Sequence, residues 1–448
     1  MRIGTIRPTR NMNVNLRRNC LLLAFFVAGV LSVLAMSPFR RHKFDVFSKL
    51  PERDSTVVFY GNSITNMFEW REAMGNAPEI INRGVSGAVV HELIDNASII
   101  ARLHPAKIFI GIGTNDLGND TLCNPDSVSA KVIRLVNTLR RDNPESKIYV
   151  QSILPSENGI RTIDNIKATN QLIRSQAEET GAIFVDLFDI LSGIPDKTIS
   201  YDGLHLTAHG YALWLDAISP LTGHRPIFTE STPIENGGIS TNSFGMRNTY
   251  FSVLPIDRSD ILFIGDEPIH GCEWHELLND QRIKNRGTGW GYGGLSLSNW
   301  RNALKAIFPD SYSKKDAPTA IYLYAGTESL YQADADPDSL IREYALLIDK
   351  IREYAPADST KLNIISLIPR SNPRLNKTLT EPFNTRLKTL AEERANTTFV
   401  DIYEILTDAN AQPLRGYIDE DFLTGEGYLS VGRILSPTLP DKVSTVKH

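Results

Sequence analysis

Ser63, Asp202 and His205 are the residues of this chain whose types and spacing best suit nucleophilic catalysis. Ser63 follows the apolar run 57–60 and a glycine, where a buried strand would give way to a helix. Ligands gather at the carboxyl ends of strands in open α/β sheets. Asp202 lies three positions before His205, so its carboxylate can orient the imidazole while the second ring nitrogen takes a proton from a hydroxyl. A serine hydroxyl needs such a base. By itself Ser63 would be interpreted as a helix cap, and only its partners predict acyl-transfer chemistry.

Acyl transfer also requires hydrogen-bond donors for the oxygen that becomes negatively charged. The backbone N–H of Ser63, the backbone N–H of Gly84 and the side-chain amide of Asn115 are the three donors that the sequence offers. A glycine at position 84 would allow close approach of a substrate. The alternative interpretation is that Gly84 and Asn115 are turn residues.

A metal site is a competing hypothesis for the same segment. His205 and His209 are four positions apart and Asp202 is near, which is a possible set of two histidines and one carboxylate. Chelation would separate the two hypotheses, because a serine hydrolase is insensitive to it. We expect no metal and no cofactor.

In order along the chain, these residues resemble the four blocks of the SGNH, or GDSL-type, hydrolases. Ser63 stands in Gly-Asn-Ser-Ile-Thr, Gly84 in Asn-Arg-Gly-Val-Ser-Gly, Asn115 in Gly-Thr-Asn-Asp, and Asp202 and His205 in Asp-Gly-Leu-His. The resemblance covers about residues 54–220. It implies a flavodoxin-like three-layer fold, esterase activity without a cofactor, a catalytic triad of Ser63, Asp202 and His205, and an oxyanion hole of Ser63, Gly84 and Asn115.

Two details refine the resemblance. The first block has Asn62 where many members have Asp, and that position does no chemistry in the family. The amino-acid sequences of the blocks are most similar to those of the branch that includes carbohydrate acetylesterases and enzymes like platelet-activating-factor acetylhydrolase.

The same pattern of blocks occurs a second time, without its chemistry. An apolar run at 261–264, Asn285-Arg286-Gly287 and Gly326-Thr327 repeat the first set. We therefore predict a degenerate and inactive second copy at 259–441, which covers an edge of the first domain or binds glycan. A glycosidase-like pair of carboxylates is the alternative. The nucleophile, third-block, acid and base positions of this copy hold, in that order, Glu267, Glu328, Asp419 and Phe422.

Short apolar runs alternate with amphipathic segments in both halves, which is typical of parallel α/β sheets. The sequence predicts two flavodoxin-like three-layer α/β/α domains with parallel sheets, preceded by an N-terminal hydrophobic helix. The expected boundaries are 1–53 for a basic N-terminus, hydrophobic segment and tether, 54–220 for the catalytic domain, 221–258 for a linker that packs on other residues, and 259–441 for the second domain.

The N-terminus resembles an export signal. Five arginines precede an apolar stretch from Cys20 to Met36, which would span about 25 Å as a helix, and Arg40, Arg41 and Lys43 follow it. An uncleaved membrane anchor and a signal peptide cleaved after Ala35 are both open, and both place the remaining chain outside the cytoplasm.

Bulk properties exclude some partners and restrict disulfides. The net charge of -5 offers no basic surplus for nucleic acid. Three cysteines exclude a disulfide framework, although a bridge between Cys123 and Cys272 stays open.

Together these features predict a secreted or membrane-anchored serine esterase for short acyl esters, with O-acetyl groups on carbohydrates as the favoured substrate. A lysophospholipase or related lipid acyl hydrolase is the first alternative. A non-catalytic glycan-binding protein is the alternative from another class. The sequence does not determine the oligomeric state.

Overall fold

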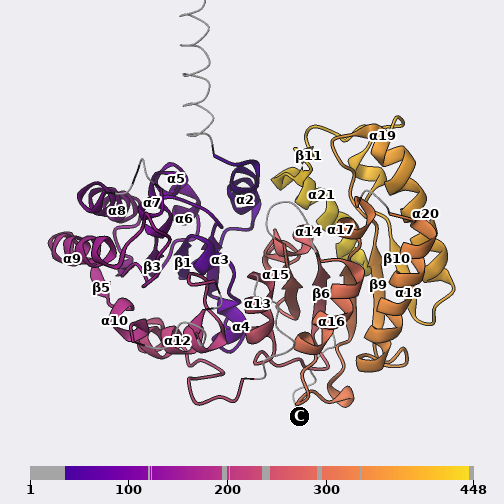
Figure 1. Cartoon of the computed structure of the whole chain (residues 1–448), viewed down its shortest axis with the longest axis horizontal. Helices are drawn as coiled ribbons and strands as arrows, with labels where there is room; N and C mark the ends of the chain where they lie inside the picture. Colours follow the sequence, from indigo (N-terminus) through magenta and orange to yellow (C-terminus); the bar gives the residue numbers. More distant parts are fainter. Residues whose placement is uncertain are drawn as a thin grey trace, which may run out of the picture.

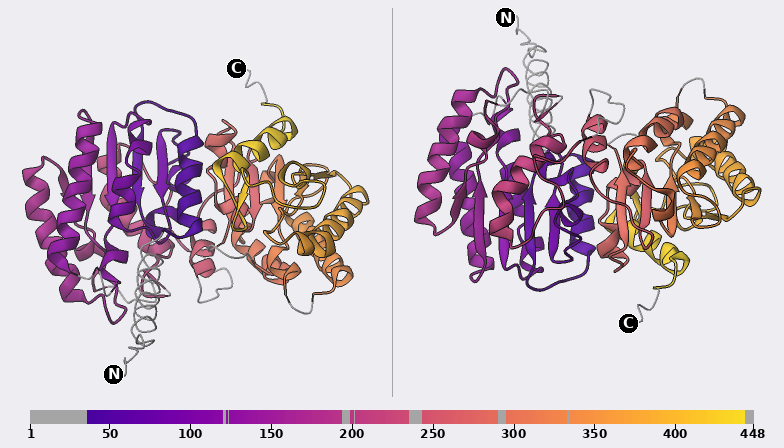
Figure 2. Two further views of the ribbon diagram at one scale, coloured as in Figure 1. Left: turned by 90° about the horizontal axis from the view of Figure 1, so that it is seen from above. Right: turned by 90° about the horizontal axis from the view of Figure 1, so that it is seen from below.

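The computed structural model describes residues 36–119, 122, 124–193, 199–200, 202–234, 243–289, 295–332 and 335–442. They form two α/β units that lie side by side (Figures 1 and 2). Each unit has a parallel five-stranded sheet with helices on both faces, and the two sheets have the same strand order. The predicted fold class is therefore confirmed for the two units.

The first unit has the strand order β2-β1-β3-β4-β5. Its strands are β1 Val57–Gly61, β2 Ile80–Gly84, β3 Lys107–Gly111, β4 Lys147–Gln151 and β5 Ile183–Val185. Helices α5, α8 and α9 pack beside one another, and α4 and α12 lie on the opposite side of the sheet (Figure 1). The helices are α3 Ser63–Asn66, α4 Trp70–Ala73, α5 Val90–Asp95, α6 Ser98–Ala101, α7 Thr114–Leu117, α8 Pro125–Asp142, α9 Ile163–Glu179, α10 Phe188–Leu191 and α12 Ala208–Thr222.

The second unit has the strand order β10-β9-β8-β6-β7. Its strands are β6 Ile261–Gly265, β7 Ile283–Gly287, β8 Ala320–Tyr324, β9 Lys361–Ile365 and β10 Thr397–Val400, with a short antiparallel pair formed by β11 Ile418–Asp419 and β12 Phe422–Leu423. The main helices are α14 Glu267–His270, α15 Trp274–Leu277, α16 Leu297–Ile307, α17 Thr327–Leu330, α18 Pro337–Tyr354, α19 Pro373–Leu375, α20 Glu381–Glu392 and α21 Gly425–Leu435.

Glycines align the carboxyl ends of three neighbouring strands in the first unit, β2, β1 and β3. Gly61 of β1 is in register with Gly84 of β2 and Gly111 of β3. A Cβ at Gly61 would lie 2.3 Å from Thr65 Oγ1, and one at Gly84 would lie 2.2 Å from the backbone nitrogen of Asn66. These positions exclude any side chain, so α3 can begin directly against the sheet edge where the loops converge.

The segment that we expected to be a tether contains a helix, α2 (Pro38–Lys49). Phe44, Val46, Phe47 and Leu50 are buried, and the helix packs along α21 of the second unit. Apolar residues at helical spacing within the basic segment explain this packing.

No helix in the described part of the chain is long and apolar enough to cross a membrane. The expected signal or anchor segment falls almost entirely within residues 1–35, which lie outside the described residues.

The expected linker 221–258 contains α13 (Ser243–Phe251). Tyr250 and Phe251 are buried, and Tyr250 donates a hydrogen bond to the carbonyl of Met67 in the first unit. The aromatic residues of the linker thus pack on the first unit. Cys272 is buried with a free thiol, while Cys20 and Cys123 lie outside the described residues.

Candidate active site

The structure brings Ser63, Asp202 and His205 into one hydrogen-bonded chain. Nε2 of His205 lies 2.9 Å from Oγ of Ser63, and Nδ1 of His205 lies 2.7 Å from Oδ2 of Asp202. Ser63 is 4% exposed and His205 is 6% exposed, so their contact is largely shielded from water. This is the arrangement in which a carboxylate orients an imidazole and the imidazole accepts a hydroxyl proton.

Ser63 is the first residue of α3, directly beyond the carboxyl end of β1. Asn62 occupies the cap position, where its side-chain oxygen accepts the backbone N–H of Ile64 at 3.1 Å. A short polar side chain at this position satisfies one of the free N–H groups at the helix start. The position that departs from the family pattern therefore anchors the helix that carries the serine.

Asp202 and His205 lie in the tight turn before α12. Oδ1 of Asp202 accepts the backbone N–H groups of Leu204 at 2.9 Å and His205 at 2.8 Å, and the hydroxyl of Ser200 at 3.2 Å. Gly203 has a φ of 75°, a value that favours glycine. One carboxylate oxygen thus fixes the turn, and the other orients the imidazole.

The electrostatics of Asp202 favour its charged form. Burial by itself would raise the pKa of this carboxyl, but the hydrogen bond and charge of the His205 ring and the two backbone N–H donors outweigh burial and lower the pKa. The carboxylate therefore stays ionised and acceptor-only at neutral pH, which holds the proton of His205 on Nδ1.

Asn115 lies at the start of α7 and is partly exposed. Its Nδ2 donates to the carbonyl of Ala88 at 2.8 Å, in the loop that follows β2. A side-chain amide carries two hydrogens, so the second hydrogen is available to a ligand. The bond to Ala88 fixes the amide against this loop.

Gly84 is the site residue whose expected role the hydrogen bonds contradict. Its N–H donates to Oδ1 of Asn82 at 2.9 Å, so it is not free for a substrate oxygen. Its glycine requirement comes instead from the close contact with Asn66. The same block holds Gly87, with a φ of 80° in a turn closed by the bond from Ala88 N–H to the carbonyl of Val85. Gly87 is the better candidate donor. The sequence analysis named Gly84 alone and missed Gly87, for which a turn that requires φ above zero was a possible signal.

Asp116 is a residue that the sequence analysis did not assign. It is fully buried, and its carboxylate accepts the N–H of Val90 at 3.1 Å, at the first residue of α5. Burial raises its pKa to about 6. Asp116 therefore links the turn that carries Asn115 to the start of α5, which directly follows the loop of Gly87.

The metal hypothesis has little support in the described geometry. Both ring nitrogens of His205 already face protein partners, Asp202 and Ser63. In the part of the chain that the structure describes, the one group of converging ligand atoms is Glu273, His275 and Glu276 in the second unit. Lys43 lies 3.7 Å from Glu273 and Arg83 lies 2.7 Å from Glu276, so basic side chains already balance the charge of the two carboxylates.

In the second unit, α2 covers the positions that correspond to the acid and the base. Asp419 accepts a hydrogen bond from Arg41 at 2.9 Å, and the ring of Phe422 lies 6.1 Å from those of Phe39 and His42. Glu267 is the first residue of α14. Burial raises its pKa to about 7, because the opposing effect of the positive charges of Arg370 and Lys43 is smaller. Glu328 lies in α17. No serine or histidine stands at the corresponding positions, so the chain Ser–His–Asp has no counterpart there.

Comparisons with known proteins agree with the class that this site suggests, a hydrolase on a parallel α/β sheet. The model of the GDSL-like lipase/acylhydrolase family matches residues 54–213. This part of the chain is therefore a GDSL-like lipase/acylhydrolase domain. No curated protein matches the chain significantly.

Solved structures with similar folds include three of bacterial proteins. One from Streptococcus pneumonia, described as a candidate platelet activating factor, is 25% identical, covers 48% of this chain and 100% of its own, and has a TM-score of 0.38. A GDSL-like lipase from Bacteroides thetaiotaomicron is 23% identical, covers 42% and 97%, and has a TM-score of 0.37. The acetylxylan esterase Axe2 from Geobacillus stearothermophilus, as a catalytic mutant, is 18% identical, covers 39% and 96%, and has a TM-score of 0.34.

Proposed function

We propose that this protein is an exported serine esterase that removes short acyl groups, with O-acetyl groups on carbohydrates as its substrate class. The observation that carries the proposal is the continuous chain from Ser63 Oγ through the His205 ring to Asp202 Oδ2, with contacts of 2.9 and 2.7 Å. The acylhydrolase family match over 54–213 supports the reaction type.

The first half of the reaction acylates Ser63. Its Oγ attacks the ester carbonyl while Nε2 of His205 takes the hydroxyl proton. The carbonyl oxygen becomes an oxyanion and accepts hydrogen bonds from the N–H of Ser63, the N–H of Gly87 and the free hydrogen of the Asn115 amide. The bond to the alcohol then breaks, and the imidazolium gives its proton to the leaving alkoxide.

The second half releases the acid. Water attacks the acyl–Ser63 carbonyl while Nε2 of His205 takes one of its protons, and the same donors stabilise the second oxyanion. The carboxylic acid leaves and the proton returns to Oγ of Ser63. Asp202 stays ionised throughout and stabilises the imidazolium. These steps use only groups of this chain and water.

The test is a substrate series on the full-length protein and on Ser63→Ala. We expect turnover of p-nitrophenyl acetate that falls as the acyl chain lengthens, release of acetate from acetylated sugars, and a loss of about 10⁴-fold or more in Ser63→Ala. Near-normal turnover by a folded Ser63→Ala protein would refute the assignment.

The same series separates the alternatives. Preference for lysophospholipids or long acyl chains would establish a lipid acyl hydrolase instead. Saccharide binding without any turnover would establish a glycan-binding protein.

A further inference from the structure

The two units contact each other through a pair of reciprocal buried ion pairs. Arg83 donates to both carboxylate oxygens of Glu276, at 2.8 and 2.7 Å, and the two side chains are 1% and 0% exposed. Arg286 donates in the same way to Glu72, at 2.9 and 2.9 Å, with 0% and 2% exposure. Each arginine is the middle residue of an Asn-Arg-Gly block, and each glutamate lies in the short helix of the other unit.

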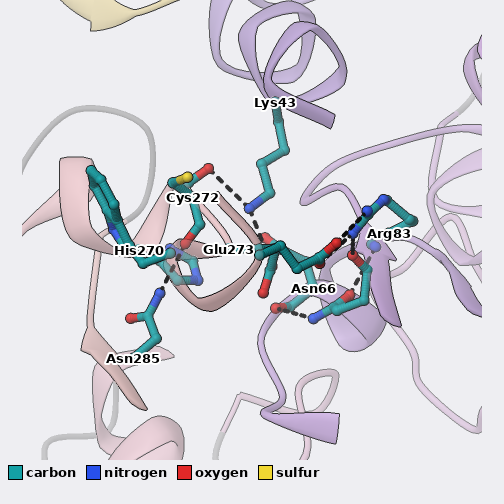
Figure 3. A network of polar contacts seen from close by, with 12 residues as sticks. Lys43, Asn66, Arg83, His270, Cys272, Glu273 and Asn285 are labelled. Carbon is teal, nitrogen blue, oxygen red and sulfur yellow. Dashed lines mark hydrogen bonds and ion pairs between the residues drawn. The ribbon is translucent and has the colours of Figure 1, made fainter. Parts of the chain in front are cut away.

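The helices that precede the two sheets are also exchanged. Lys43 of α2, ahead of the first sheet, donates to the carbonyl of Gly271 at 3.0 Å and pairs with Glu273 of the second unit. Figure 3 shows Lys43 extending from α2 to the loop that carries Cys272 and Glu273. Arg247 of α13, ahead of the second sheet, contacts the carbonyl of Met67 and the carboxylate of Glu69 in the first unit.

The exchange extends to the start of the last helix in each unit. Oδ2 of Asp45 in α2 accepts the N–H of Gly425, the first residue of α21. Oγ1 of Thr249 in α13 accepts the N–H of Ala208, the first residue of α12. Because α12 follows the turn of Asp202 and His205, a helix from the second half of the sequence completes the first unit. Reciprocal contacts of this kind are typical of a two-fold interface with exchanged elements.

Arg83 stands directly before the loop that carries the candidate oxyanion donor. Val85 N–H donates to the carbonyl of Gly61 at 2.9 Å, two residues before Ser63. Ser86 Oγ donates to Oδ1 of Asn66 in the helix of Ser63 at 2.9 Å. The carbonyl of Ala88 accepts the amide of Asn115. The 84–88 loop therefore connects the serine helix to Asn115. The residue directly before this loop is Arg83, which is hydrogen-bonded to Glu276.

Glu276 is the carboxylate to which Arg83 is hydrogen-bonded, and the charge of Glu273 also interacts with Arg83. Arg83 also donates a hydrogen bond to its neighbour, the carbonyl of Asn82, at 2.8 Å, and its guanidinium lies over the face of Phe47 at 4.9 Å. A guanidinium that loses its carboxylate partner inside a protein is strongly destabilised and moves toward water. Such a movement would displace the residue directly before the 84–88 loop.

We propose that the second unit is an internal partner that positions the candidate esterase site, and that Glu276 is its positioning residue, acting through Arg83 on the 84–88 loop. This inference rests on the proposed function. It gives the second unit a role in the first unit's reaction without any chemistry of its own.

The reciprocal interface provides a matched control. Glu276→Gln removes the buried charge partner of the loop beside Ser63, whereas Glu72→Gln removes the same kind of partner beside Glu267 of the second unit. Both changes cost a bidentate buried ion pair, so we expect both to lower the melting temperature by similar amounts. We expect kcat for p-nitrophenyl acetate to fall about 10-fold or more in Glu276→Gln, with KM changed less than about 2-fold, as for lost transition-state stabilisation. We expect Glu72→Gln to keep its kcat within about 2-fold.

A milder pair of substitutions keeps the test decisive if either glutamine variant does not fold. Arg83→Lys retains the positive charge but loses the bidentate hydrogen bonds to the carboxylate, and Arg286→Lys is its control. We expect a kcat loss only in Arg83→Lys. Equal effects in the matched variants, or unchanged kcat in a folded Glu276→Gln protein, would overturn the positioning role.

Labelling of Ser63 in the wild-type protein by an organophosphonate is measured in parallel. Absence of both labelling and turnover in the wild-type chain would mean that the proposed function has failed. Normal wild-type turnover with no difference between the matched variants would mean that only the positioning role has failed.

Discussion

Replacing Asp202 with asparagine tests how the carboxylate controls His205. Oδ1 of Asp202 accepts three donors, from Ser200, Leu204 and His205, so the amide oxygen of the asparagine side chain must occupy this position. The amide NH₂ then faces Nδ1 of His205, where Oδ2 now lies at 2.7 Å. An NH₂ group is a donor only, so Nδ1 must become an acceptor and the ring proton must move to Nε2. The nitrogen that faces Ser63 would then carry a proton and could not accept another.

The expected loss follows from this exchange of tautomers. We expect kcat for p-nitrophenyl acetate to fall by about 10⁴-fold at neutral pH, as when a triad carboxylate is replaced by its amide. This corresponds to about 5 kcal/mol of transition-state stabilisation. The turn should survive, because the amide oxygen still accepts the two backbone N–H groups, and circular dichroism with thermal unfolding checks this. A folded Asp202→Asn protein that keeps more than a tenth of the wild-type kcat would refute the role of Asp202.

Four further predictions concern other parts of the molecule. Asn115→Ala should lower kcat by about 10²–10³ with little change in KM, and steady-state kinetics would contradict an oxyanion role by showing a change in KM alone. The value of kcat/KM should fall toward acid pH, because a protonated His205 is no base, and a flat acid limb would contradict this. Burial raises the pKa of Glu267 to about 7, so the contribution of this group to stability is present below the ordinary pKa of 4.5 and lost as the pH rises through about 7. Glu267→Gln should therefore raise the free energy of unfolding at pH 8 by at most about 3 kcal/mol, leave it unchanged at pH 4, and leave esterase activity unchanged. Equal free energies of unfolding of the variant and the wild type at pH 8, or a loss of activity, would contradict this prediction. Fractionation should find the protein with membranes or outside the cytoplasm, and a cytosolic full-length chain would contradict export.

The candidate catalytic residues were accessible from sequence because each lies in a short local pattern. A strand followed by Gly-Asn-Ser places Ser63 at the sheet edge, and the spacing from Asp202 to His205 suits one turn. The parallel sheets followed from apolar runs alternating with amphipathic segments. The register of Gly61 with Gly84 and Gly111 then gathers these loops at one edge.

The features that the sequence analysis missed depend on contacts between distant segments. Arg41 and Lys43 suggested a tether, because nothing in the sequence shows that Asp419 and the carbonyl of Gly271 receive these charges. Gly84 was assigned as an oxyanion donor because only the structure shows that its N–H is bonded to Asn82.

The exchange of helices has a consequence for the second unit as an isolated domain. A fragment of residues 259–441 would lack α2, which fills the surface beside α21 with Phe44 and Phe47. It would also leave Arg286 buried without its partner Glu72. We therefore expect the two units to unfold together, and the full chain is the appropriate object for each of these experiments.

The most direct test of the central claim is to locate the nucleophile by covalent labelling. The full-length protein is treated with an organophosphonate probe for serine hydrolases, digested, and analysed by peptide mass spectrometry. Our account predicts one phosphonylated peptide with the modification on Ser63, loss of ester turnover in step with labelling, and no labelling in Ser63→Ala or His205→Ala. Labelling at another serine, or full ester turnover by protein that carries the probe on Ser63, would contradict it.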